Sequence, residues 1–447
     1  MAPVLEQRAA FTAAGARFLK EFDARSKAGR QQGPSWLRQL RERAMADFAA
    51  QGLPTTRDEE WRFTPITPIA DTAFVPGEPL HVSPDDLAPW TFGADTAAEL
   101  VFVNGIFVPA LSCVTDLPAG LEVGALSLVL AAGGADIEPY LAKVASTDGS
   151  PFTALNTALF DEGAFVRVGK NAVIDRPVHV LFYSTVSGAP SVSHPRLLVV
   201  VGEHAEMRIV ETYAGPGGQV YFTNAVSEFV AGDRAVVDHC RLQRESTAAY
   251  HVGAMQVRTG RETVFVSHNL ALGAALARND IGAVLGGEGG DTTLNGLYVG
   301  DGTQLVDNHT TIDHAQPHNG SHEVYKGLLG GRARGVFNGK IIVRPDAQKT
   351  DAKQTNKALL LSAEAQINTK PQLEIFADDV KCTHGATVGQ LDPDMLFYLR
   401  ARGLGLTDAR ALLIRSFAGD AVNRVKFAPL RERLEEALLA LIPKGAD

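Results

Sequence analysis

The sequence predicts a mainly β protein, a parallel β-helix (a solenoid) flanked by N-terminal and C-terminal α-helical segments. Three observations support this fold class. Short runs of strand length fill the middle of the chain and recur with a glycine-led start about every 30 residues. Helical patterns are confined to the first 53 residues and to those after Asp392. The chain has 43 glycines but only 7% aromatic residues, which suits turns and stacked strands.

The N-terminal region, residues 1–97, is expected to hold two helices and a linker. Ala, Leu, Arg and Glu dominate the first 53 residues, and Gly33-Pro34 interrupts them. The second helix is predicted from residue 35 to 50, with an apolar side that includes Trp36 and Phe48. In the linker, the acidic run at 58–60 precedes Trp61. This run is consistent with a helix N-terminus or a docking segment, but a solvated face is the preferred interpretation.

The middle region, residues 98–390, carries the repeat. Its units start at Gly169, Gly202, Gly232, Gly260, Gly289, Gly331 and Ser362, so successive starts differ by 33, 30, 28, 29, 42 and 31 residues. The longest interval contains a further similar unit, GDGTQL, at Gly300. Propeller blades need about 40–50 residues, so the shorter period favours coils that stack into one continuous core. A two-sheet sandwich with regular turns is the alternative. Almost no helical pattern occurs in this region.

The C-terminal region, residues 391–447, returns to helix. Asp392 is a suitable N-cap, Pro393 fits the first helical position, and Gly403 can end the helix in the left-handed conformation. Two more helices are predicted, one from about residue 407 and one over 429–441. All three are amphipathic, so their apolar faces must dock on the solenoid, on one another or on a partner.

Composition excludes several functional classes. The 447-residue chain has a formal net charge of −9, which argues against broad binding to nucleic acid or to an anionic membrane. No apolar run reaches the roughly 18 residues of a transmembrane helix. Three widely spaced cysteines cannot form a disulfide framework, so we expect a cytoplasmic protein. The phosphate-loop pattern is absent, so the chain is not itself a P-loop ATPase. The common zinc motifs are absent too.

Cys382 and His384 form the first candidate site, in the sequence KCTHGATVG. In a strand, residues i and i+2 point to the same face, so the thiol and the imidazole would project side by side. Both are good ligands for iron or zinc, and Lys381 could favour the thiolate. Two ligands do not complete a metal site, so others must come from elsewhere. A small buried cysteine beside a hydrogen-bonded histidine is the alternative.

A histidine-rich stretch is the second candidate: His309, Asp313, His314, His318 and His322. The spacings of 5, 4 and 4 between its histidines resemble metal spacing on a helix, but Pro317 and Asn319-Gly320 oppose a helix here. In a strand and loop, these side chains would point in different directions. They are therefore expected to be solvated histidines of the solenoid surface, without an assigned role.

Several sequence blocks resemble a known family. They are YKG at Tyr325, VFNG at Val336, KTDA at Lys349, TKPQLEIFADDVKCTHGATVG from Thr369, LPTTRDEEWRFTPI from Leu53 and YLRARG from Tyr398. Together they resemble the SufB/SufD family of iron–sulfur cluster assembly proteins, and most closely its SufD branch. The resemblance covers about residues 50 to 420. No cysteine-rich N-terminal segment of the SufB kind is present.

The resemblance implies a right-handed parallel β-helix and a non-catalytic scaffold subunit that pairs with SufB. It also implies binding of the ATPase SufC through the C-terminal helices. Cys382 and His384 match the family's cysteine and histidine near the junction with SufB, and the histidine is the one most associated with cluster formation. An iron–sulfur cluster or iron would be held transiently in the complex. The isolated chain would hold no tight cofactor and could pair with itself.

The C-terminal helices contain apolar residues that a small helical pair cannot fully bury. Phe397, Leu404, Leu413 and Phe417 are therefore predicted to form the ATPase-binding surface within residues 392–426. Two other functional classes compete with the scaffold. Parallel β-helices also serve as carbohydrate-active enzymes, which are mostly secreted, and the chain could be a purely structural solenoid. In the structural case, Cys382 and His384 could be changed without loss of function.

Overall fold

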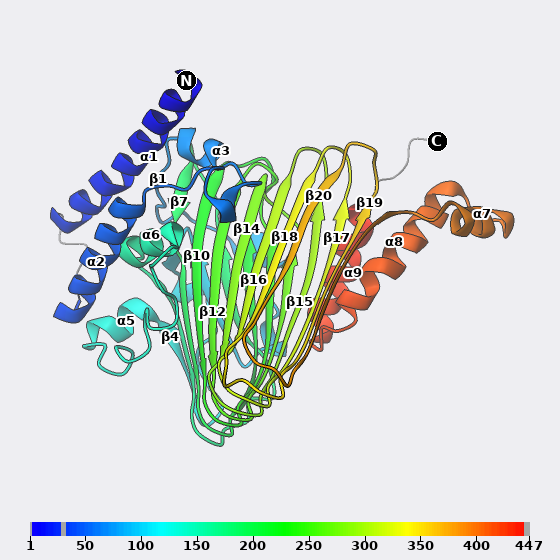
Figure 1. Ribbon diagram of the computed structural model, residues 1–447. Coiled ribbons are helices and arrows are strands. Elements are labelled where there is room, and N and C mark those ends of the chain that lie inside the picture. The colour runs from blue at the N-terminus through cyan, green and yellow to red at the C-terminus, as the bar shows by residue number, and fades with distance from the viewer. Residues whose placement is uncertain (1, 28–32, 442–447) are drawn as a thin grey trace.

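The computed structural model describes residues 2–27 and 33–441; the rest of the two predicted terminal regions lies outside them. Two long sheets stack face to face, and the chain alternates between them in a parallel β-solenoid of about eight turns (Figure 1). Helices occupy both ends of the chain. The predicted fold class is confirmed, because neighbouring strands pair in parallel across successive turns rather than through the hairpins of a sandwich.

Each turn contributes one strand to each sheet. The first sheet consists of β4 (Leu121–Ala125), β5 (Gly163–Val168), β8 (Arg196–Val201), β10 (Tyr221–Ala231), β12 (Tyr250–Thr259), β14 (Leu276–Leu285), β16 (Leu305–His314), β18 (Arg334–Val343) and β20 (Gln366–Ile375), with β1 (Val75–Pro76) and β7 (Ser191–Ser193) beside it. The second consists of β3 (Ile106–Phe107), β2 (Ala98–Val103), β6 (Val178–Tyr183), β9 (Glu206–Ala214), β11 (Val236–Arg244), β13 (Val264–Ala271), β15 (Asp291–Gly300), β17 (Gly320–Leu329), β19 (Asp351–Leu360) and β21 (Lys381–Gln390).

The core lies between the sheets, where alternate residues of every strand point inward. Apolar side chains such as Phe229, Phe265 and Phe337 fill it, and stacked turns make it continuous. At about 25 cal/mol per Å² of buried apolar surface, this stacking is the main stabilising term.

Two kinds of corner explain the sequence repeat. Gly202, Gly232 and Gly260 begin corners that lead from the first sheet to the second. Gly331 and Ser362 begin the opposite corners, and so does GDGTQL at Gly300. The 42-residue interval between the repeat starts at Gly289 and Gly331 therefore runs from a corner of the first type to one of the second type. The starts of the second type, at residues 300, 331 and 362, lie 31 residues apart.

The first corners use the left-handed backbone conformation at residues other than glycine. His204, Arg234 and Lys349 have φ values of 57°, 56° and 62°. This conformation costs about 1–2 kcal/mol per residue. The backbone N–H of each of these residues donates to a carbonyl of the next coil, as from His204 to Asp233 at 2.9 Å. These hydrogen bonds between stacked corners thus offset the cost of the left-handed conformation.

The helices cover the solenoid in two groups. They are α1 (Ala2–Lys27), α2 (Ser35–Gln51), α3 (Thr67–Asp71), α4 (Pro84–Leu87), α5 (Leu126–Ala131), α6 (Pro151–Leu159), α7 (Pro393–Ala401), α8 (Leu406–Val422) and α9 (Ala428–Leu441), with 3-10 turns at Glu59–Trp61, Gly93–Asp95 and Pro109–Leu111. The prediction of almost no helix within residues 98–390 is wrong for α5 and α6. These two short helices lie in an insertion that packs at the N-terminal end.

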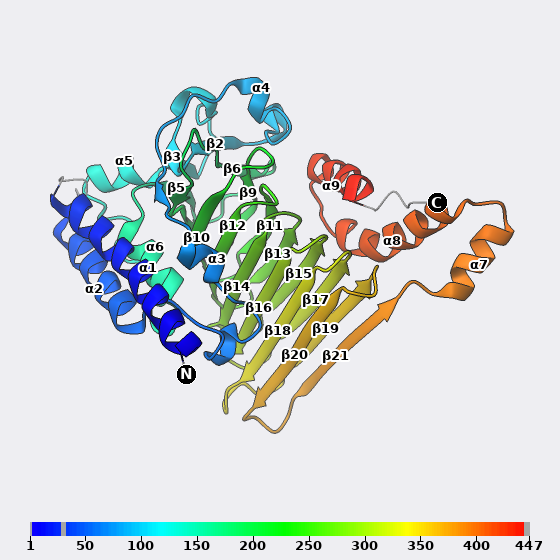
Figure 2. The ribbon, with the colours of Figure 1, turned by 90° about the horizontal axis from the view of Figure 1, so that it is seen from above.

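The C-terminal helices follow the predicted signals closely. Asp392 caps α7 by accepting hydrogen bonds from the backbone N–H groups of residues 394 and 395, and Gly403 follows the helix with φ 93°. Helices α8 and α9 pack on the outer face of the second sheet, against residues such as Leu270, Leu297 and Leu328. Figure 2 shows α7 projecting beyond α8, away from both sheets. In the described part of the chain, no helix is long and apolar enough to cross a membrane.

Candidate functional site

The last coil leaves one end of the solenoid open. Within the described residues, β20 pairs only with β18, and β21 pairs only with β19, so each has one unpaired edge (Figure 2). No further coil covers the inward faces of these strands. Inward residues of β19 are buried, whereas most of those of β21 are exposed. The open end therefore presents both backbone edges and inward-facing side chains.

Cys382 and His384 lie on β21 and share its inward face. They align in register with Ala352 and Gln354, which are both buried inside the preceding coil. Two residues of strand rise place their backbones about 6–7 Å apart. Cys382 and His384 therefore share one face, as predicted, at the open end of the solenoid, which we call its mouth. Glu323 lies one coil further from the open end, because it aligns in register with Gln354.

The two side chains have different surroundings. Cys382 is half-buried and packs against an apolar cluster that includes Ala352 and Ala377. Burial raises the pKa of the Cys382 thiol, and Asp351 adds to this effect. The sequence-based expectation that Lys381 favours the thiolate is thus not met in the isolated chain. His384 is exposed, so its ring is accessible to a ligand or a partner chain.

Behind the mouth, the core contains polar groups that the sequence analysis missed. Gln354 Nε2 donates to Glu323 Oε2 at 2.7 Å, and both residues are at least 98% buried. Burial raises the pKa of Glu323 to about 7. Deeper inside, Glu211 accepts from Ser227 at 2.6 Å and lies 3.2 Å from Arg241. Alternating polar residues in strand-length runs are the signal that could have revealed these groups.

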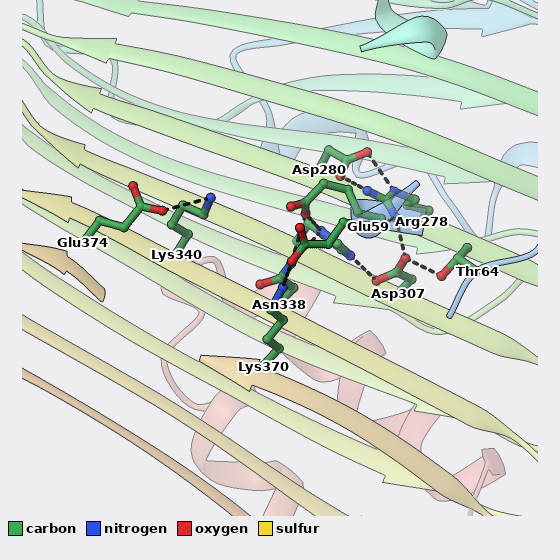
Figure 3. Close-up of polar contacts among 11 residues, drawn as sticks. Glu59, Thr64, Arg278, Asp280, Asp307, Asn338, Lys340, Lys370 and Glu374 are labelled. Atoms are coloured by element: carbon green, nitrogen blue, oxygen red, sulfur yellow. Dashed lines mark hydrogen bonds and ion pairs between the residues drawn. The ribbon is translucent and has the colours of Figure 1, made fainter. Parts of the chain in front are cut away.

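A second polar cluster lies on the outer face of the first sheet, where residues 59–64 dock (Figure 3). Trp61 is buried, and the guanidinium of Arg278 lies 3.7 Å from its ring centroid. Arg278 also bonds both oxygens of Asp280, at 2.8 and 3.0 Å, and Asp307 at 2.8 Å. Thr64 donates to Asp307 at 2.5 Å. The segment therefore docks through Trp61 and Thr64, whereas the acidic residues at 58–60 stay exposed, as the preferred interpretation expects.

His309 completes this cluster. Its ring nitrogens lie 3.0 Å from Asp307 and 3.1 Å from Glu60. Burial lowers the pKa of His309, but the Asp307 and Glu60 carboxylates outweigh this effect and raise the pKa to about 9. The imidazole is therefore charged and held from both sides at neutral pH. Cavities of about 380 and 460 Å³ flank the cluster. Charges of both signs line each cavity, so neither selects a ligand by charge.

The histidine-rich stretch does not converge on one point. His314 is buried, bonds Ser321 at 2.9 Å, and has its pKa lowered to about 4 by burial. His318 lies exposed on a corner, and His322 on the outer face of the second sheet. The expectation of solvated surface histidines is correct for these two and wrong for His309 and His314. Among the described residues, no three His, Cys, Asp or Glu side chains are grouped to hold a metal ion.

The predicted ATPase-binding residues divide into two sets. Phe397 on α7 is 75% exposed, and Leu404 is 36% exposed just after it. Leu413 is half-buried. Phe417 instead packs on the solenoid, where the Lys326 ammonium lies 5.1 Å from its ring and donates to its carbonyl at 2.9 Å. Phe417 is thus partly buried and helps to anchor α8 on the solenoid.

The architecture described above is that of a β-solenoid with an open terminal coil and a Cys–His pair at its mouth. Comparison with known proteins identifies the family. Residues 182–417 match the family model described as "SUF system FeS cluster assembly, SufBD core domain", and residues 13–180 match "SufBD protein N-terminal region". The chain belongs to the SufBD family, as its sequence motifs indicated. Membership of this family implies a role in iron–sulfur cluster assembly.

Named relatives agree with this assignment. The chain is 38% identical to an iron–sulfur cluster assembly SufBD family protein of Synechocystis, over 86% of this chain and 87% of the relative. It is 30% identical to the iron–sulfur cluster assembly protein SufD of Escherichia coli, over 88% and 90%. It is also 28% identical to SufD of Bacillus subtilis, over 93% and 95%.

Proposed function

We propose that this protein is a non-catalytic scaffold subunit that pairs with SufB through the open end of its solenoid and binds the ATPase SufC through its C-terminal helices. The single observation that carries the proposal is the pair of half-buried Cys382 and exposed His384 on the inward face of the last coil. Polar residues with ligand chemistry are rarely left at an uncovered core face unless another molecule completes it. The family assignment favours this reading over a carbohydrate-active enzyme.

The open end has the features of a pairing surface. Unpaired strand edges on β20 and β21 offer free N–H and C=O groups to another chain. Apolar side chains around these edges are exposed, including Phe376 at 63% and Val388 at 47%. A partner that adds strands here would satisfy the backbone and cover these side chains. The same surface could join two copies of this chain when SufB is absent.

The chemistry at this interface is transient capture of iron and sulfide as cargo. Imidazole and thiolate are good ligands for iron. Two ligands leave other coordination positions of the iron open, and side chains of the partner would fill them. Because burial raises the pKa of Cys382, its thiol keeps a proton until a metal displaces it. His384 is then the stronger contributor, as a ligand or as a proton carrier near neutral pH. We expect no tightly bound cofactor in the isolated chain.

The ATPase would dock on α7 and the exposed side of α8. Met395, Phe397, Tyr398, Leu406 and Leu412 are exposed there, although such side chains normally pack inward. Helix α7 projects from the body of the protein, where a groove on a partner could enclose it (Figure 2). All three cysteines are free, which fits a reducing, cytoplasmic compartment.

Co-expression with SufB and SufC tests the proposal. The three chains are purified together under anaerobic conditions, and iron and sulfide are measured. His384→Ala should leave the complex intact but remove most of its iron and sulfide, and it should fail to complement a strain that lacks this protein. His318→Ala, which changes an exposed corner histidine, is the matched control and should behave as the wild type.

Two outcomes would contradict the assignment of His384. Full complementation by His384→Ala would exclude a role in cluster chemistry. Loss of the complex, seen by size exclusion, would make His384 a packing residue of the interface instead.

A further inference from the structure

Two buried side chains stand in line behind His384. Parallel strand register places Glu323, Gln354 and His384 side by side on β17, β19 and β21, all on the inward face. Neighbouring strands are about 4.8 Å apart, so Gln354 lies within side-chain reach of both of the others. Gly339 on the facing strand β18 leaves room for the Gln354 amide, because a Cβ there would overlap its nitrogen.

A hydrogen bond to Glu323 fixes the orientation of the Gln354 amide. Its Nε2 donates to Glu323 Oε2 at 2.7 Å. Above its pKa of about 7, the Glu323 carboxylate is ionised and can only accept, so the amide nitrogen then faces Glu323 and the oxygen faces elsewhere. That oxygen, Oε1, is buried and has no hydrogen-bond partner among the described residues. An unpaired buried acceptor is unfavourable, and the strand on the other side of Gln354 is β21, where His384 is its register partner.

We propose that Gln354 is a positioning residue that accepts a hydrogen bond from the ring N–H of His384 and thereby fixes one tautomer of that ring. A neutral imidazole has one donor nitrogen and one acceptor nitrogen. If Gln354 takes the donor, the acceptor nitrogen is left facing the mouth of the solenoid, where it can bind a metal. Partners of this kind commonly orient metal-binding histidines. The metal-binding consequence rests on the proposed function, but the hydrogen bond itself does not.

The test is a measurement of the His384 ring by NMR. The full-length, metal-free chain is labelled with ¹⁵N-histidine and studied at about pH 8.5, where an ordinary imidazole and Glu323 are both deprotonated. The His384 signals are assigned by their loss in His384→Ala. In the wild type, the two ring nitrogens should have the widely separated shifts of a single tautomer. In Gln354→Leu, the two shifts should move toward each other as the tautomers mix.

Gln243→Leu is the matched control. Gln243 is also buried, lies on β11 far along the stack from the mouth, and donates from its Nε2 to Glu245 at 2.9 Å. This variant should leave the His384 shifts unchanged. Equal shifts in the wild type and Gln354→Leu would overturn the proposal, and so would mixed tautomers in the wild type.

Glu323→Gln provides a second variant if Gln354→Leu fails to fold. A glutamine at 323 can donate as well as accept, so the Gln354 amide would lose its fixed orientation, and partial mixing of the tautomers is expected. Unchanged shifts in this variant would also overturn the proposal. These readouts do not depend on cluster assembly. Full complementation by His384→Ala would therefore refute the proposed function while leaving the hydrogen bond to be judged by NMR.

Discussion

Two histidines of the same solenoid, His309 and His384, differ in whether their partners are already present. His309 is only 12% exposed beside the docked segment at Trp61, and carboxylates hold both of its nitrogens. His384 lies exposed on the last strand, where the next coil is missing. A polar group with all its partners in its own chain stabilises the fold. A polar group left at an open core face is available to another molecule. Mutations around His309 are therefore expected to lower the stability of the fold, whereas mutations at His384 are expected to impair function and leave the fold intact.

The largest effect on stability is expected at the Trp61 cluster. Arg278→Ala removes the cation from buried Asp307 and the contact with the Trp61 ring. Removing one member of a buried ion pair costs about 3–5 kcal/mol, because the remaining charge is uncompensated. Urea unfolding should show a loss of this size, whereas the exposed Arg258→Ala on β12 should stay within about 0.5 kcal/mol. Equal losses would refute the view that this cluster stabilises the fold.

The protonation of His309 should make stability pH-dependent. The Asp307 and Glu60 carboxylates raise the pKa of His309 in the folded state from 6.5 to about 9, while Arg278 opposes them. The resulting stabilisation is complete below pH 6.5 and is lost as the pH rises through about 9. A shift of this size corresponds to about 3 kcal/mol.

The unfolding free energies of the wild type and of His309→Gln, measured at about pH 6 and pH 10, provide the check. The difference between the two proteins should be large at the lower pH and small at the higher. A difference that does not change with pH would show that the His309 charge contributes no stability.

A smaller, local effect is expected on α7. Phe397→Asp should leave the unfolding free energy nearly unchanged, because the side chain is 75% exposed. It should weaken SufC binding by about 2 kcal/mol or more, since buried aromatic anchors dominate interfaces. Co-purification and a binding titration measure this loss. Leu128→Asp changes an exposed apolar residue of α5 at the other end and should bind SufC normally.

Deleting the whole segment 392–447 is a poorer test than Phe397→Asp. Helices α8 and α9 cover apolar residues of the second sheet, including Leu242, Leu270 and Leu297. Their removal would expose that face, so loss of binding could reflect loss of folding. A single change on α7 separates the two effects.

The same contrast explains what could be predicted from the sequence. Strand runs, the glycine-led corners and the capping signal at Asp392 depend on neighbours in the chain, and they gave the solenoid and its C-terminal helices correctly. The same-face placement of Cys382 and His384 also followed from local geometry. The docking of Trp61 on Arg278 joins residues more than 200 positions apart. No local pattern encodes such a contact, and the packing of Phe417 on the solenoid and the burial of Glu323 were missed for the same reason.

The smallest effect is expected for Cys382→Ser, which tests whether the two residues of the open site are equal. Cys382 is half-buried against the apolar cluster that includes Ala352 and Ala377, and burial raises the pKa of its thiol. The thiol therefore bears a proton in the isolated chain, which a metal would have to displace, whereas the imidazole of His384 is exposed. Serine keeps the size of the side chain but is a weak ligand for iron. We expect a reduction of several-fold in iron and sulfide in the co-purified complex, with growth retained in the complemented strain and stability changed by less than about 1 kcal/mol. A loss as complete as that of His384→Ala would show instead that a partner chain converts Cys382 into an equal ligand, by supplying the positive charge or metal that lowers its pKa.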